Sequence, residues 1–166
     1  MSKTFYIFRH GITYFSKKGL PYGDKQLTAE ILPEGVQAIE RMAEHLGSLP
    51  IDHFYSSELL RCTQTAHIVS RVTHIPFETD ARLNELTSIA PESFNDSKAR
   101  VEHFLKMIDE SPDTSIAICT HGAIIAALKH LLTTGTYNLF NLMDYPKSGV
   151  LLTVEGKTVT STDFND

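Results

Sequence analysis

The sequence of 166 residues has no tryptophan and only two cysteines, Cys62 and Cys119. Each cysteine stands alone in an apolar stretch, so the sequence shows neither a disulfide framework nor the CxxC pattern of redox and zinc sites. We expect both thiols to be buried. Long hydrophobic runs are also missing, since none approaches the roughly 20 apolar residues of a membrane-spanning helix.

The amino-terminal residues show no pattern of a secretory leader, which combines a cationic start, a long apolar stretch and a small-residue cleavage site. Instead they run directly into an apolar segment that is typical of a strand. With neither a leader nor a membrane span in the sequence, we expect a cytoplasmic protein without a membrane partner.

Basic residues are in the minority, with 15 Lys and Arg against 20 Asp and Glu and a formal net charge of −5. This balance excludes the broad basic face that sequence-independent binding of nucleic acid requires. An anionic ligand would have to be held by a few converging cations. At this length one core buries roughly 70% of the surface of the unfolded chain. We therefore expect a single domain over residues 1–166, and the sequence leaves its oligomeric state open.

Strand patterns and helix patterns alternate along the chain. Residues 4–8 and 115–119 are apolar on both faces, as in strands that are covered on two sides. Residues 150–154 and 158–160 are expected to form a closing hairpin. The alternation predicts an α/β fold, a three-layer α/β/α sandwich with a mostly parallel central sheet.

Apolar residues at helical spacing predict four helices between these strands. They run from 34 to 46, from a cap at Ser56-Ser57 through Val69, from about 97 to 108, and from 122 to about 132. Two stretches rich in Gly, Pro and polar residues, 13–33 and 87–96, are predicted to be loops.

Two of the predicted strands end in the same dipeptide. His10-Gly11 follows the first strand, and His121-Gly122 follows the strand at 115–119. In open parallel sheets, ligands bind at the carboxyl ends of strands, where the following loops converge. We therefore expect both imidazoles to face one cleft. The alternative, that each is an ordinary loop histidine, is weakened because the dipeptide recurs.

Arg61 and Glu85 are two further candidates with weaker individual signals. Arg61 lies in the first turn of a predicted helix, where a cation opposes the helix dipole and costs up to about 1 kcal/mol unless an anion is near. An arginine extended over a solvated face is an equally good interpretation. Glu85, judged alone, would be a surface carboxylate.

Five segments match motifs of one family in the same order along the chain. They are RHGIT at 9–13, LPEGVQA at 32–38, YSSELLRCTQTA at 55–66, RLNE at 82–85 and THG at 120–122. Together they resemble the histidine phosphatase superfamily, also called phosphoglycerate mutase-like. The resemblance covers nearly the whole chain and implies a phosphoglycerate mutase-like fold.

The resemblance implies one role for each matching residue. His10 would take the phosphoryl group onto a ring nitrogen, while Arg9, Arg61 and His121 would hold the phosphoryl oxygens. Glu85 would act as an acid and then as a base. Neighbouring guanidinium groups would keep His10 neutral and therefore nucleophilic. No step in this chemistry requires a metal or another cofactor.

Two small residues complete the predicted substrate site. Gly122 begins a helix whose amide groups face the same anion, and it lacks a Cβ that would obstruct the backbone's approach. Ser16 stands where the family commonly has an asparagine that binds phosphate. Its shorter side chain is expected to donate one hydrogen bond.

Other departures from the family pattern concern the surroundings of the site. Ile12 replaces a residue that is often acidic, Glu58 stands where proline is usual, and no Gly-rich continuation follows Glu85. The stretch between Glu85 and His121 is too short for a capping insertion. We therefore expect an open, wet pocket that would favour hydrolysis over mutase chemistry.

An uncapped site resembles that of the small phosphohistidine phosphatases. We expect a metal-independent phosphatase that hydrolyses phosphomonoesters or phosphohistidine, with a phosphorylated small molecule or a phosphoprotein as its substrate. The alternatives are a phosphoglycerate mutase-like phosphotransferase and a catalytically weak protein that binds phosphate ligands.

Overall fold

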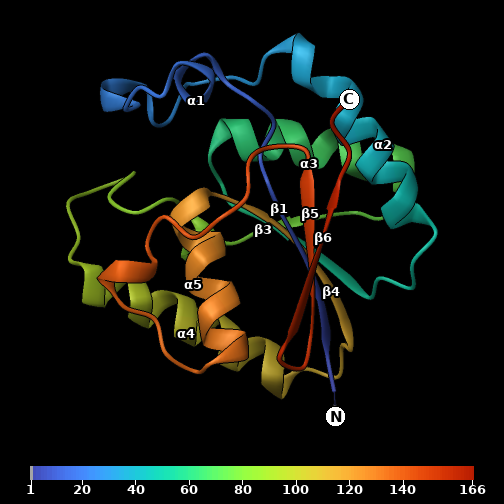
Figure 1. Ribbon diagram of the computed structural model, residues 1–166, viewed down its shortest axis with the longest axis vertical. Helices are drawn as coiled ribbons and strands as arrows, with labels where there is room; N and C mark the ends of the chain where they lie inside the picture. Colours follow the sequence, from blue (N-terminus) through green and yellow to red (C-terminus); the bar gives the residue numbers. More distant parts are fainter. Residues whose placement is uncertain (1) are drawn as a thin grey trace.

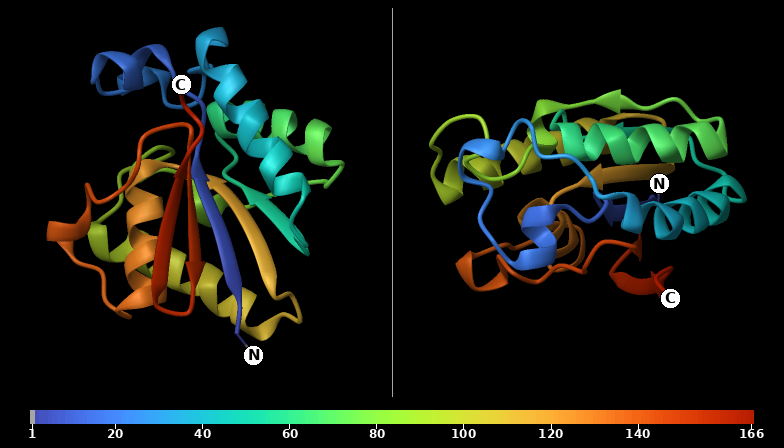
Figure 2. Two further views of the ribbon diagram at one scale, coloured as in Figure 1. Left: turned by 45° about the vertical axis from the view of Figure 1, so that its right-hand side comes forward. Right: turned by 90° about the horizontal axis from the view of Figure 1, so that it is seen from above.

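The computed structural model describes residues 2–166. One six-stranded sheet has the strand order β3-β2-β4-β1-β5-β6, and helices cover both of its faces (Figures 1 and 2). The strands are β1 (Thr4–Arg9), β2 (His53–Ser56), β3 (Glu78–Thr79), β4 (Ser115–Thr120), β5 (Val150–Glu155) and β6 (Thr158–Asp163). The helices are α1 (Tyr14–Lys18), α2 (Val36–Gly47), α3 (Leu60–Thr73), α4 (Phe94–Glu110) and α5 (Gly122–Thr133). The predicted three-layer α/β fold is confirmed.

The central strands β1 and β4 run parallel and in register. Phe5 lies opposite Ile116 and Arg9 lies opposite Thr120, so both strands end at the same level. On the other side of β1, the hairpin of β5 and β6 adds two antiparallel strands. The sheet is therefore mostly parallel, and the predicted hairpin is present.

Alternate residues of each strand pack against different helices, because successive side chains of a strand point to opposite faces. Tyr6 and Phe8 belong to a core that is shared with α2 and α3. Phe5 and Ile7 belong to a second core, which is shared with α4 and α5. Both faces are covered, and this explains why the strand is apolar throughout.

The predicted helix cap at Ser56-Ser57 is wrong. Ser56 is the last residue of β2, and α3 begins only at Leu60, after Leu59 at the N-cap. The hydroxyl of Ser57 donates to the side chain of Asn84 at 3.0 Å. The same oxygen accepts from the Leu59 N–H at 3.1 Å, one residue before α3 begins, and nothing in the nearby sequence reveals the contact with Asn84.

Both predicted loops contain helical structure. Residues 13–33 include α1, which begins in a capping box between Thr13 and Ser16, and one 3₁₀ turn, Gly23–Lys25. A second 3₁₀ turn, Pro33–Gly35, begins at the last residue of this stretch. The loop expected at 87–96 ends earlier, because Ser93 accepts a hydrogen bond from the Asp96 N–H and starts α4. Polar side chains that cap helices also occur in loops, so the pattern is ambiguous.

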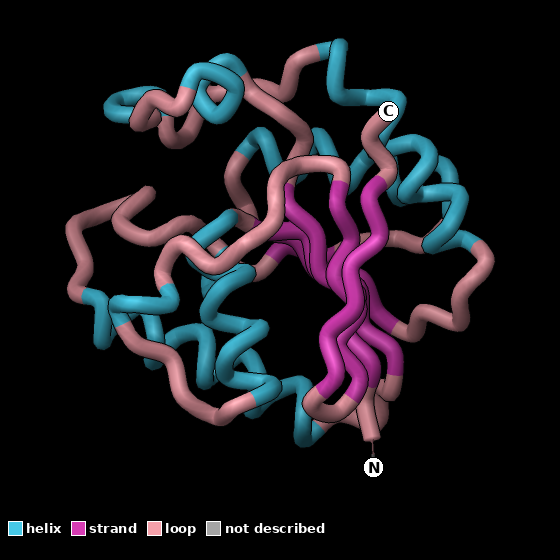
Figure 3. The backbone as a smooth tube through the Cα atoms, viewed as in Figure 1, coloured by secondary structure: helices cyan, strands magenta, loops and turns pink. Residues whose placement is uncertain are grey.

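The chain from Gly11 to Pro33 lies beyond the carboxyl ends of the parallel strands (Figure 3). It crosses from the end of β1 towards the start of α2. Among residues 2–166, none of the helices has the length and hydropathy required for a membrane span.

Candidate active site

His10 and His121 lie side by side at the carboxyl ends of β1 and β4. Their ring centroids are 5.3 Å apart, and the His10 N–H bonds to the carbonyl of Thr120 at 3.2 Å. Both residues are almost completely buried, at 1% and 0% exposure. The parallel register of the two strands brings the rings together, as the repeated dipeptide predicts.

Arg61 reaches the same place from the first turn of α3. Its side chain is 0% exposed, so the alternative of an arginine on a solvated face is wrong. Its two terminal nitrogens donate to the backbone and side-chain oxygens of Gln26, at 2.7 and 2.9 Å. The ring of Tyr22 lies 3.9 Å from the guanidinium carbon, a distance typical of a cation–π contact.

Arg9 is the last residue of β1, and its guanidinium lies 5.2 Å from the ring centroid of Tyr145. Tyr145 also packs against Gly122, where any Cβ would collide with its ring. Glycine is therefore required at this position by the aromatic neighbour. This is a different reason from the one that the sequence suggested, the approach of backbone to an anion.

Few buried polar side-chain atoms in residues 2–166 lack a hydrogen-bond partner, and most of these lie at this site. Buried polar groups are normally paired. Three of the unpaired atoms belong to residues that the resemblance assigns to phosphoryl binding. The unpaired atoms are Arg9 Nε, Arg61 Nε, His121 Nδ1 and Ser88 Oγ.

The hydrogen bond of His10 identifies its nucleophilic nitrogen. His10 Nδ1 lies 2.8 Å from the carbonyl oxygen of Gly11, which only accepts, so the proton is on Nδ1 and the lone pair is on Nε2. Burial, followed by the charges of Arg9 and Arg61, holds the pKa of His10 well below its ordinary value. The ring is thus neutral and nucleophilic near neutral pH.

Glu85 is half-buried in the loop that follows Leu83. Burial raises the pKa of its carboxyl above 4.5, against a smaller opposing effect of the Leu86 N–H, which bonds to it at 2.9 Å. The charges of Arg61 and Arg9 also oppose the rise. A carboxyl with a raised pKa retains a proton that it can give to a leaving group.

Ser16 lies in the first turn of α1. Its hydroxyl accepts from the Thr13 N–H at 2.9 Å and completes the capping box of α1. Together with Arg9 it lines a cavity of about 380 Å³. The structure gives Ser16 a local role in α1 that accounts for its hydrogen bonds.

The open, wet pocket that the sequence predicts is not observed, because both imidazoles are buried. The two arginines of the site also have close neighbours: Tyr22 and Gln26 contact Arg61, and Tyr145 contacts Arg9. These segments precede α2 and β5, so the short stretch before His121 says nothing about them. None of these three residues is expected at the site from the sequence, where their only signal is two aromatic residues within otherwise polar connections.

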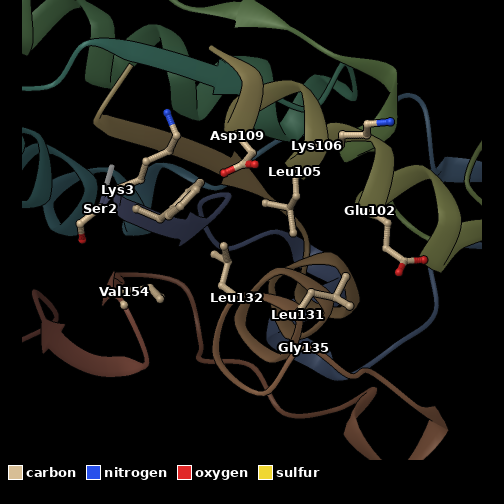
Figure 4. Close-up of a pocket in the computed structure, with 12 residues that line it drawn as sticks. Ser2, Lys3, Glu102, Leu105, Lys106, Asp109, Leu131, Leu132, Gly135 and Val154 are labelled. Carbon is tan, nitrogen blue, oxygen red and sulfur yellow. The ribbon is translucent and has the colours of Figure 1, made fainter. Parts of the chain in front are cut away.

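A larger cavity, of about 560 Å³, lies at the amino ends of the strands (Figure 4). Its wall includes Lys3, Lys106, Asp109 and two leucines of α5, Leu131 and Leu132. It has no histidine and no unpaired buried nitrogen. In the described part of the chain, no group of three or more His, Cys, Asp or Glu side chains is arranged to hold a metal ion.

Comparison with known proteins agrees with this geometry. The chain is 37% identical over 83 residues to the probable phosphoglycerate mutase GpmB of Proteus mirabilis, a match that covers 49% of this chain and 37% of that protein. It therefore spans well under half the length of that relative.

Solved structures resemble the whole chain. The α-ribazole phosphatase of Shigella flexneri has a TM-score of 0.78 at 19% identity, with 98% of this chain and 96% of that chain covered. A mycobacterial glucosyl-3-phosphoglycerate phosphatase in complex with VO3 has a TM-score of 0.76 at 21% identity, with 96% of each chain covered. At these identities the likeness shows the fold.

The family itself is shown by a sequence model that spans the chain. The model of the histidine phosphatase superfamily (branch 1) matches residues 5–88 and 87–166, which include both His-Gly dipeptides, Arg61 and Glu85. The chain belongs to this superfamily.

Proposed function

We propose that this protein is a metal-independent phosphatase that hydrolyses phosphomonoesters through a phosphohistidine intermediate on Nε2 of His10. A single domain over residues 1–166 carries the activity. The observation that supports it most strongly is the pair of buried, unpaired guanidinium nitrogens of Arg9 and Arg61 beside a neutral imidazole. A tetrahedral oxyanion is the ligand that such donors suit.

In the first step, Nε2 of His10 attacks phosphorus and the bond to the leaving oxygen breaks. Glu85 gives its proton to that oxygen, so that the product leaves as an alcohol. Arg9 and Arg61 stabilise the charge that spreads over the equatorial phosphoryl oxygens.

In the second step, Glu85 as a carboxylate takes a proton from the water that attacks phosphohistidine. The bond between phosphorus and Nε2 breaks, inorganic phosphate leaves, and His10 returns to its neutral form. Glu85 is protonated again and ready for the next cycle. Each proton that Glu85 gives in the first step is thus recovered in the second.

The presence of Glu85 as a proton donor supports an ester as the substrate rather than phosphohistidine. An alkoxide leaving group needs a proton donor, and burial raises the pKa of Glu85 as this role requires. The structural relatives named for α-ribazole and glucosyl-3-phosphoglycerate also support a phosphorylated small molecule. Phosphohistidine is the weaker candidate, because a phosphoramidate depends less on a strong acid.

A mutase is a second candidate, and the burial of His10 favours it. A mutase must protect phosphohistidine from water until a second hydroxyl accepts the group. His10 is 1% exposed, which suits this purpose, and part of the chain is similar to a probable phosphoglycerate mutase.

A panel assay separates these candidates. Purified protein in excess chelator is incubated with sugar phosphates, phosphorylated hydroxy acids and a phosphohistidine peptide, and free phosphate is measured. We expect release from at least one ester, with none from His10→Ala. Transfer to a second hydroxyl in preference to water would identify a mutase. Binding without release would identify a phosphate-binding protein, and loss of activity that added metal restores would contradict the mechanism.

A further inference from the structure

A chain of hydrogen bonds runs from Glu58 to His121, and the family motifs give no role to its middle members, Ser57 and Asn84. Glu58 stands where the family usually has proline, so the chain of bonds includes a residue by which this protein departs from the family pattern. Ser57 and His121 are each 0% exposed, and Asn84 is 4% exposed. In this setting each hydrogen must have a defined acceptor.

Glu58 fixes the orientation of the Asn84 amide. The backbone N–H of Glu58, which only donates, bonds to Asn84 Oδ1 at 2.9 Å, and Asn84 Nδ2 donates to Glu58 Oε1 at 3.0 Å. Turning the amide over would place donor against donor at one contact and acceptor against acceptor at the other. Oδ1 is therefore the Asn84 atom that faces Ser57.

The amide orientation decides the direction of the Ser57 hydroxyl. Asn84 Oδ1 only accepts, so Ser57 donates its one proton to it, at 3.0 Å. The Ser57 oxygen can then only accept. It does so from the Leu59 N–H at 3.1 Å and from His121 Nε2 at 2.8 Å. His121 therefore carries its proton on Nε2, and Cys62 Sγ, 3.4 Å from the same nitrogen, is a second and weaker acceptor.

The remaining ring nitrogen of His121, Nδ1, then presents a lone pair. It is buried and has no partner in residues 2–166. Burial, and after it the positive charges nearby, including those of Arg61 and Arg9, lower the pKa of His121 well below its ordinary value. The ring is thus neutral in the free enzyme. A lone pair cannot donate to a phosphoryl oxygen, and it can only accept a proton from one.

We propose that Ser57 is a positioning residue for His121, because it holds the ring as the Nε2–H tautomer. The phosphoryl group then binds with one proton shared between His121 Nδ1 and a phosphoryl oxygen. Asn84 and Glu58 hold Ser57 in turn. The proton arrives with the monoanion of the phosphate group and leaves with it. This inference rests on the proposed phosphatase function.

Nitrogen NMR of protein labelled with ¹⁵N in histidine tests the inference without turnover. The His121 signals are assigned by comparison with His121→Gln. We expect the free enzyme to carry the proton on Nε2, and inorganic phosphate to move the Nδ1 resonance towards that of a protonated nitrogen. In Ser57→Ala we expect a mixture of tautomers, whereas Ser57→Thr keeps the hydroxyl and restores the single form.

Steady-state kinetics provide the second readout. Ser57→Ala removes one buried hydrogen bond, and we expect KM and the inhibition constant of inorganic phosphate to rise about tenfold with a smaller change in kcat. Adding Asn84→Ala to Ser57→Ala should cost little more, because the two residues act in series. Ser56→Ala is the matched control: Ser56 is equally buried, but its hydroxyl donates to the Ser57 carbonyl. We expect Ser56→Ala to keep both the tautomer and KM.

The outcomes separate this inference from the phosphatase proposal. A proton on His121 Nδ1 in the free wild-type protein would overturn the positioning role, whatever the activity. An unchanged tautomer in Ser57→Ala would overturn it as well. A fixed Nε2–H tautomer in a protein that releases no phosphate from any ester would instead leave the positioning role intact and contradict the phosphatase.

Discussion

The two ends of the parallel strands differ in how their polar groups are paired. At the amino ends, His53 bonds to Asp113 at 3.1 Å and to Glu78 at 2.9 Å. Lys3 donates to the backbone carbonyls of Ser111 and Asp113. At the carboxyl ends, no carboxylate pairs with either buried imidazole in residues 2–166, and three buried nitrogens have no partner.

This difference indicates that unpaired buried polar atoms, and not the volume of a cavity, mark the candidate active site. The larger cavity is at the amino ends, and none of the unpaired buried nitrogens found in residues 2–166 belongs to its lining. An unpaired buried polar group costs about 1–3 kcal/mol, and such a cost is usually retained where a ligand compensates for it. The carboxyl ends of the strands therefore form a site that its substrate completes.

Replacement of the nucleophile should give the largest effect. We expect His10→Ala to lower phosphate release by about 10³-fold or more, because the variant lacks the nitrogen that attacks phosphorus. Phosphate release from the best ester of the panel is the measurement. Retention of more than a tenth of the wild-type rate would remove His10 from the reaction.

Removal of the buried guanidinium of Arg61 should give the second-largest loss of activity. We expect Arg61→Ala to reduce kcat/KM by about 10²-fold or more, since it stabilises charge in the transition state. Arg61→Lys should recover little, because an ammonium lacks the planar fork. Arg41→Ala is the control, since Arg41 bonds to the Phe164 carbonyl away from the site, and its rate should stay within about twofold of wild type.

Removal of the acid should depend on the leaving group. With alkyl phosphates, we expect Glu85→Gln to lower kcat by about 10²-fold. With p-nitrophenyl phosphate, whose leaving group needs no proton, the loss should be much smaller. Equal losses with both substrates would contradict the assignment of Glu85 as the acid.

The raised pKa of Glu85 also predicts a dependence of stability on pH. In the folded state the carboxyl keeps its proton above pH 4.5, where the unfolded chain releases it. The stabilisation from this group is complete below pH 4.5 and is lost as pH rises through the folded-state pKa. Glu85→Gln should therefore be more stable than wild type at pH 7.5 and equal to it at pH 4. Urea unfolding at both pH values measures the difference, and a constant difference would contradict burial of the carboxyl.

The paired end of the molecule should give the smallest effect. We expect His53→Ala to leave kcat/KM within about twofold and to lower the free energy of unfolding by about 1 kcal/mol or less, as for other part-exposed ion pairs. Thermal and urea unfolding check the second value. A loss of activity comparable to that of Arg61→Ala would remove the contrast between the two ends.

The parts of the fold that depend on periodic burial could be predicted from the sequence. The strand from Thr4 and the helix through Ile39 and Leu46 repeat apolar residues at the spacing of their elements. The convergence of His10 and His121 could also be predicted from the sequence, since parallel strands in register end at the same edge of the sheet.

The parts that depend on contacts between distant segments could not be predicted. Tyr22 and Gln26 contact Arg61, although more than 30 residues of sequence separate them from it. No local sequence pattern predicts such a contact. Ser57 looked like a helix cap because serines often cap helices, but α3 begins only at Leu60, and the long-range partners of Ser57 are Asn84 and His121. Long-range side-chain pairing decided both outcomes.

The position of the phosphoryl group on the trapped enzyme tests the central claim most directly. Enzyme quenched during turnover with base, in which phosphohistidine is stable, can be examined by mass spectrometry and by ³¹P and ¹⁵N NMR. Because the Gly11 carbonyl accepts the Nδ1 proton of His10, the phosphoryl group should be on Nε2 of His10. Turnover with the group on Nδ1, on another residue or on no residue would contradict the account.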